Sequence, residues 1–175
     1  MKLEVSVEVP FPRQRVFEVY RDKLVELLPY LPNVRGIQQI ERTDDGAVSR
    51  MLNHWKGGGD IPAVARAFVS EKLLEWDDYA TWNASAFTCD WRTEVGAFKE
   101  AVKAEGRTNF EEVGADRTRL VIKGVIEVDA KKVKAVPRLL AGTIGPAVES
   151  FLVATIKPNL VSVGSGLTKY LTANR

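Results

Sequence analysis

The spacing of hydrophobic residues changes once along the chain, near residue 130, and this change limits the folds that the sequence can adopt. Before it, apolar and polar residues alternate in short runs, beginning with residues 2–9, and such alternation predicts strands with one buried face. After it, apolar residues recur every three or four positions, which is the spacing of one helix face. They include Val136, Leu140, Ile144, Val148 and Phe151. The sequence therefore predicts a sheet followed by a long C-terminal helix.

Turn signals divide the first part of the chain into consecutive strands. Asp45-Gly46 and the run 113–116 are typical of hairpin turns, because Asp and Gly tolerate the backbone angles that tight turns need. The expected strands are 2–9, 34–42, 47–55, 65–76, 81–94, 98–112 and 117–128. Strands joined by short connections pair antiparallel. Two short apolar stretches, 12–20 and 24–31, are expected to form short helices after the first strand.

Prolines shape the expected C-terminal helix. Gly145-Pro146 predicts a break or a kink, because proline cannot donate a hydrogen bond to the carbonyl four residues earlier. We therefore expect a short helix over 136–143 and a long one from about 146 to 171, with a further kink at Pro158.

Length and charge narrow the classes of function. The 175 residues predict one domain spanning 1–175. The net charge of +2, from 25 basic and 23 acidic residues, argues against a nucleic-acid partner, which rewards a concentrated basic face. No apolar run reaches the roughly 18 residues of a membrane span, although Lys131, Lys132 and Lys134 allow a transient membrane contact. With no signal peptide and the single cysteine Cys89, a cytoplasmic protein is expected; the oligomeric state stays open.

The expected inner face of the sheet carries few large side chains, which predicts either a close helix approach or a ligand cavity. We favour the cavity, because a curved sheet around one helix cannot easily close completely. Binding sites of this kind are concave, mostly apolar and largely preformed. The candidate ligand-binding residues come from two strands and the C-terminal helix. They are Trp82, Ala84, Ala86, Thr88, Val102, Ala104, Gly106, Thr108, Phe110, Leu140, Ile144 and Val148.

The residues that could perform chemistry are few. A single histidine, His54, and a single cysteine exclude a multi-histidine metal site or a disulfide, and no phosphate-binding loop occurs, so no metal and no cofactor are expected. His54 is either a polar group of the pocket or a strand-end residue near solvent, and Cys89 is either a nucleophile or an unreactive thiol. Asp77 and Asp78 point to opposite faces if extended, and we interpret both as turn or surface charge.

The order of these segments resembles the START/Bet v 1-like superfamily, also called the SRPBCC or polyketide cyclase/dehydrase-like superfamily. The resemblance covers nearly the whole chain, and the segments that carry it are 3–10, 12–19, 30–34, 106–112, 118–122 and the long helix. It implies an α+β helix-grip fold, in which a curved antiparallel sheet wraps around a long C-terminal helix and encloses a hydrophobic cavity. Members bind lipids, sterols, polyketides or plant hormones, and some are cyclases or dehydratases. The resemblance supplies no invariant catalytic residue.

Two functions follow as hypotheses. The first, which we favour, is binding or transport of a hydrophobic, lipid- or polyketide-like small molecule without catalysis. The second is a polyketide cyclase or dehydratase, which needs a polar group at the right depth to move protons. A buried acid–base pair in the cavity would favour the enzyme, and a smooth apolar cavity would favour the carrier.

Overall fold

The computed structural model describes residues 1–58, 74–96, 99–132 and 141–174. In chain order the elements are β1 (Lys2–Val9), α1 (Arg13–Asp22), η1 (Val25–Tyr30), β2 (Val34–Asp45), β3 (Val48–Gly57), β4 (Glu75–Asn83), β5 (Thr88–Glu94), β6 (Val102–Gly114), β7 (Arg117–Val128), η4 (Ala130–Lys132) and α3 (Ala141–Ala173).

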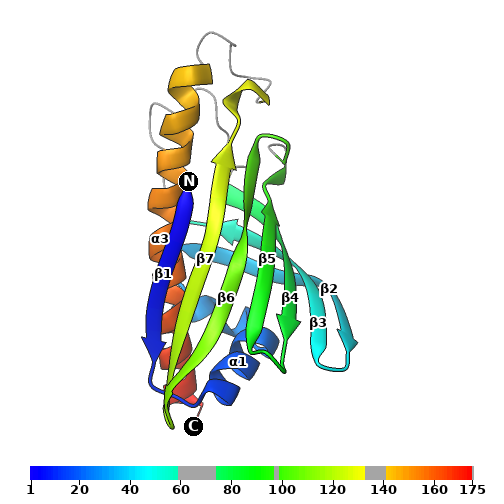
Figure 1. Ribbon diagram of the computed structural model, residues 1–175, viewed down its shortest axis with the longest axis vertical. Helices are drawn as coiled ribbons and strands as arrows, with labels where there is room; N and C mark the ends of the chain where they lie inside the picture. The colour runs from blue at the N-terminus through cyan, green and yellow to red at the C-terminus, as the bar shows by residue number, and fades with distance from the viewer. Residues whose placement is uncertain (59–73, 97–98, 133–140, 175) are drawn as a thin grey trace.

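The described strands form one antiparallel sheet in the order β1-β7-β6-β5-β4-β3-β2. Figure 1 shows that the sheet is curved, with α3 running beside β1 along one edge and α1 lying near the end of the molecule that holds the C-terminus. Helix α3 packs mainly on β1, β7 and η1. The expected α+β helix-grip fold is therefore confirmed. No described helix combines the length and the hydropathy needed to cross a membrane.

The core forms where α1 meets the sheet and the C-terminal half of α3. Phe17 of α1 is fully buried and makes edge-to-face contacts with Trp82, Phe87 and Phe110, at centroid distances of 5.5, 5.4 and 5.1 Å. Leu167 of α3 is also fully buried in this cluster. Aromatic contacts of this geometry add to the apolar area they bury, so α1 is held firmly at one end of the concave face.

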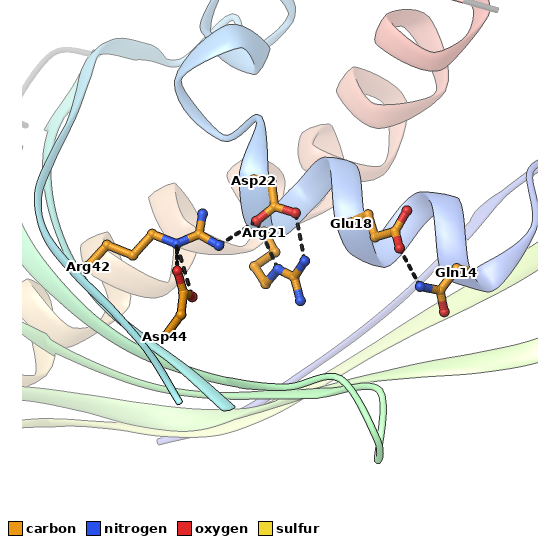
Figure 2. A network of polar contacts seen from close by, with 6 residues as sticks. All are labelled: Gln14, Glu18, Arg21, Asp22, Arg42 and Asp44. Carbon is orange, nitrogen blue, oxygen red and sulfur yellow. Dashed lines mark hydrogen bonds and ion pairs between the residues drawn. The ribbon is translucent and has the colours of Figure 1, made fainter. Parts of the chain in front are cut away.

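Charged side chains fasten the end of α1 to strand β2 (Figure 2). Arg42 of β2 lies 2.9 Å from Asp22, the last residue of α1, and 2.9 Å from Asp44. Arg21 binds Asp22 as well, at 2.7 Å. Each exposed pair contributes little energy by itself, but together they fix where the helix ends relative to the β2–β3 hairpin.

The expected strand 81–94 is wrong, because the chain turns between β4 and β5. Asn83 Oδ1 accepts a hydrogen bond from the Ala86 N–H at 3.0 Å, and Phe87 adopts a φ of 52°. The sequence Asn83–Phe87 contains no glycine or proline, so its turn signal is limited to Asn83 and Ser85. Most of the expected strand 65–76 lies outside the described residues.

The expected break at Gly145-Pro146 is also wrong. Helix α3 is continuous from Ala141 to Ala173 and includes both Pro146 and Pro158. Each proline removes one helical donor, but the many remaining bonds of a 33-residue helix allow it to continue through them. The expected short helix over 136–143 lies mostly outside the described residues.

Candidate functional site

A cavity of about 190 Å³ lies between the sheet and α3. All seven strands contribute to its wall, together with Tyr20 of α1 and a set of α3 residues that includes Ile156 and Leu160. The cavity exists because α3 packs mainly on the β1–β7 side of the sheet, and α1 covers only one end of the concave face, through Phe17. An apolar cavity of about 150 Å³ is enough to hold benzene, so this one has room for a small ring-containing molecule.

Aromatic side chains dominate one side of the cavity. Trp55 and Trp76, which are paired across β3 and β4, stack with their ring planes 11° apart and their centroids 5.8 Å apart. Tyr20 meets Trp82 edge to face at 5.2 Å. These four rings line the same cavity, and they give it flat apolar surfaces that suit a planar ligand.

Two glycines make room for a further tryptophan. Gly106 and Gly124 are paired across β6 and β7, and a Cβ on either would lie within 2.7 Å of the Trp91 indole. The Trp91 side chain therefore covers the space that these glycines leave open, and Trp91 itself lines the cavity. Gly106 faces inward as expected, but the Trp91 ring occupies the space beside it. No space for a ligand remains at that position.

The two aspartates of β4 have different surroundings: the interpretation as surface charge holds for Asp77 and is wrong for Asp78. Asp77 faces the outer side of the sheet, where its Oδ1 lies 2.8 Å from His54 Nδ1. Glu75 Oε2 lies 3.8 Å from Nε2 of the same histidine. Asp78 lines the cavity. His54 is accordingly a half-buried residue of the outer face and takes no part in the cavity wall.

Asp78 is a carboxyl group surrounded by protein, and the surface it does expose borders the cavity. Burial raises its pKa from 3.8 to about 6. Asn53 and Trp55 lie beside the carboxylate and partly oppose this shift, with Asn53 Nδ2 donating to Asp78 Oδ2 at 3.4 Å. A carboxyl group with a pKa near neutrality can both accept and donate a proton.

Four polar atoms of other cavity residues are buried without a hydrogen bond of good geometry in the described structure. They are Asn53 Oδ1, Trp55 Nε1, Trp82 Nε1 and Asn159 Oδ1. An unsatisfied buried polar atom costs about 1–3 kcal/mol, and native proteins contain few of them. Water or a bound molecule in the cavity can supply the missing partners.

Two other titratable groups of the cavity wall stay neutral. Burial raises the pKa of the Cys89 thiol, and nearby Asp78 and Asp90 raise it further. The pKa of Tyr20 is raised by burial and by Cys89 and Asp78. A buried neutral thiol is a poor nucleophile, so the structure favours the interpretation of Cys89 as an unreactive thiol. No cluster of three or more His, Cys, Asp or Glu side chains suited to a metal ion occurs within the described part of the chain.

The cavity brings together only part of the predicted ligand-binding set. Four of its members line the cavity: Trp82, Val102, Ala104 and Thr108. Ala84 and the exposed Ala86 belong to the turn after β4, and Phe110 is packed in the core. Thr88 is paired with Asn109, outside the cavity wall, because the turn reverses the expected alternation. Leu140 and the side chains of Ile144 and Val148 lie outside the described structure. Ligand contact by any residue of the predicted set stays a prediction.

Sequence reasoning missed the polar residues Asn53, Asp78 and Asn159, and it also missed the aromatic wall residues Tyr20, Trp55, Trp76 and Trp91. A signal for Asp78 was present, because it lies two and four residues from Trp76 and Trp82 respectively and therefore shares their face of β4. Asn53 could then have been found as the residue of β3 that is paired with Asp78. Asn159 follows Pro158, where the expected kink obscured which way the helix would face.

No protein-family model and no curated protein matches the sequence. Solved structures do match. TTHA0849 from Thermus thermophilus has a TM-score of 0.69 at 18% identity, over 99% of both chains. The Zhui aromatase/cyclase from Streptomyces sp. R1128 has a TM-score of 0.68 at 17% identity, over 97% of this chain and 92% of its own. Ara h 8.0201 has a TM-score of 0.56 at 12% identity, over 99% and 98%. These likenesses show the fold, which is Bet v 1-like.

Proposed function

We propose that this chain, whose Bet v 1-like fold is a ligand-binding fold, binds a small and largely apolar molecule in the cavity between its sheet and α3. The observation that carries the proposal is the cavity of about 190 Å³ with its walls of tryptophan and aliphatic side chains. Transfer of apolar surface from water into such a site contributes about 25 cal/mol per Å², so a ring-sized molecule gains enough to bind.

The volume also limits the ligand. Sites for drug-sized molecules typically occupy about 300–1,000 Å³, whereas this cavity has about 190 Å³. A ligand of one or two rings fits these dimensions, and a long acyl chain or a four-ring sterol does not fit without movement of the walls. This narrows the lipid- or polyketide-like class expected from the sequence toward its smaller aromatic members.

The test is to fill the cavity from the sheet side. Ala104 lines the cavity and is buried, whereas Ala86 is exposed in the turn after β4. Ala104→Trp should weaken binding of 1-naphthylmethanol, measured by isothermal titration calorimetry, by at least about tenfold, or about 1.4 kcal/mol. Ala86→Trp is the matched control and should bind like the wild type. Absence of binding to the wild type, or equal loss in both variants, would contradict the proposal.

A second candidate, acid–base catalysis on a polyketide-like substrate, is favoured by one observation, the carboxyl group of Asp78 in the cavity with a pKa of about 6. In a dehydration, the carboxylate would take the proton from the carbon next to a carbonyl and then return it to the departing hydroxyl, which leaves as water. Incubation with a β-hydroxyketone carrying an aromatic ring tests this. Dehydration that is lost in Asp78→Asn supports it, and no dehydration by the wild type refutes it.

A further inference from the structure

Asp78 is the one carboxyl side chain of the described cavity wall, and it is ionised near neutral pH. The described wall contains no lysine, arginine or histidine. The other titratable groups there, Tyr20 and Cys89, are held neutral by burial. No ion pair to Asp78 occurs among the described residues. Its partners are neutral: the Asn53 amide, which donates a long hydrogen bond of 3.4 Å, and the Trp55 indole, which also lies beside the carboxylate. Burying a carboxylate without a counter-charge is unfavourable, and the folded chain already bears this cost before any ligand enters.

The surroundings of Asp78 are aromatic. Trp76 lies two residues away on the same face of β4, and Trp55 is paired with Trp76 and stacked on it. The faces of indole rings attract cations, and this attraction grows when water is excluded. A carboxylate without a counter-charge, set beside stacked indoles, suits a positively charged organic group better than a neutral or an anionic one.

The unsatisfied polar atoms of the same cavity also favour a ligand with an ammonium group. An ammonium carries three N–H donors and no acceptor. The acceptors in the cavity wall include the Asp78 carboxylate and the unsatisfied oxygens of Asn53 and Asn159. The unsatisfied indole N–H of Trp82 would pair with an acceptor elsewhere on the ligand, such as an ether or hydroxyl oxygen.

We propose that the ligand of this cavity is an organic amine with one or two aromatic rings, whose ammonium group pairs with Asp78 while its rings lie against Trp55 and Trp76. This inference rests on the proposed binding function and specifies its ligand class. The ligand's ammonium loses its hydration on binding, but folding has already removed much of the hydration of the carboxylate, so less than the usual desolvation cost of two ions opposes the pairing.

The experiment compares two probes of the same shape, 1-naphthylmethylamine and 1-naphthylmethanol, by isothermal titration calorimetry at pH 7.5. The wild type should bind the amine at least about tenfold more tightly than the alcohol. Equal affinities, or tighter binding of the alcohol, would overturn the amine proposal while leaving small-molecule binding intact. If neither probe binds the wild type, the binding function itself fails and the inference fails with it.

Asp78→Asn removes the charge and keeps the shape and the hydrogen-bond acceptor. It should abolish the preference for the amine and leave the affinity for the alcohol nearly unchanged. Asp77→Asn is the matched control, since it removes a carboxylate one residue away on the outer face of β4, and it should retain the full preference. A preference that survives in Asp78→Asn, or is lost equally in both variants, would overturn the proposal. Far-UV circular dichroism of each variant establishes that the comparison is made on folded protein.

Discussion

Replacing Asp78 with asparagine should stabilise the protein at neutral pH, and the gain should disappear in acid. In the folded chain burial raises the pKa of Asp78 from its ordinary value of 3.8 to about 6. The folded state therefore holds this proton more tightly than the unfolded state does. Consequently, the contribution of Asp78 to the free energy of unfolding is most favourable below about pH 4 and declines as the pH rises to about 6. Asparagine carries no charge at any of these pH values and avoids this loss.

The size of the effect follows from the two pKa values. Each pKa unit corresponds to about 1.4 kcal/mol, so the interval from 3.8 to about 6 corresponds to at most about 3 kcal/mol. The cavity exposes part of the carboxyl group, which reduces the gain below this upper value. Asp78→Asn should accordingly unfold at higher urea concentration than the wild type at pH 7.5, and at nearly the same concentration at pH 4.

Urea denaturation followed by tryptophan fluorescence measures both proteins at both pH values. Groups other than Asp78 change the absolute stability between pH 4 and 7.5, but they cancel in the difference between variant and wild type. Asp77→Asn is the control and should change stability by less than about 1 kcal/mol at either pH, as exposed pairs do. The reasoning is refuted if Asp78→Asn destabilises the protein at pH 7.5, or if its effect is the same at both pH values.

Three further changes test other parts of the structure. Gly106→Ala would place a Cβ 2.5 Å from the Trp91 ring and even closer to the Lys123 carbonyl, and it should destabilise the protein by about 1–3 kcal/mol in urea denaturation. Gly114→Ala is the control, because its Cβ meets nothing closer than 3.9 Å, and equal effects of the two substitutions would contradict this account. Cys89 should react with a thiol reagent far more slowly in the folded protein than in urea, because its side chain is buried and its pKa is raised; equal rates would show that the thiol is accessible. Arg42→Ala breaks the contact with α1 in Figure 2 and should cost about 1 kcal/mol or less in thermal denaturation, and a loss of several kcal/mol would mean that the network supports the core.

Much of the fold was determined by local patterns. The alternation of residues 102–110 correctly placed Val102, Ala104 and Thr108 on the inner face of β6, because a strand alternates its side chains whatever it packs against. The period of three to four in the last segment likewise predicted a long helix, and Gly46 marked the β2–β3 hairpin, where it adopts a φ of 58°. These features depend on residues close together in sequence, and the sequence therefore determines them by itself.

The candidate site was decided at the tertiary level. The turn after Asn83 depends on a side-chain hydrogen bond and on Phe87 in a left-handed conformation. Asn83 and Ser85 are the local signal for this turn, but the position of Phe87 is accompanied by its packing against the distant Phe17. The significance of Asp78 depends on what surrounds it, since the same Asp-Asp pair would be ordinary surface charge in a sheet without a cavity. Its burial, which raises its pKa, arises because segments far away in the chain pack around it, including the neighbouring strands β3 and β5. A pattern of residues determines which face a side chain takes, but the dielectric surroundings of that face exist only after distant segments have packed together.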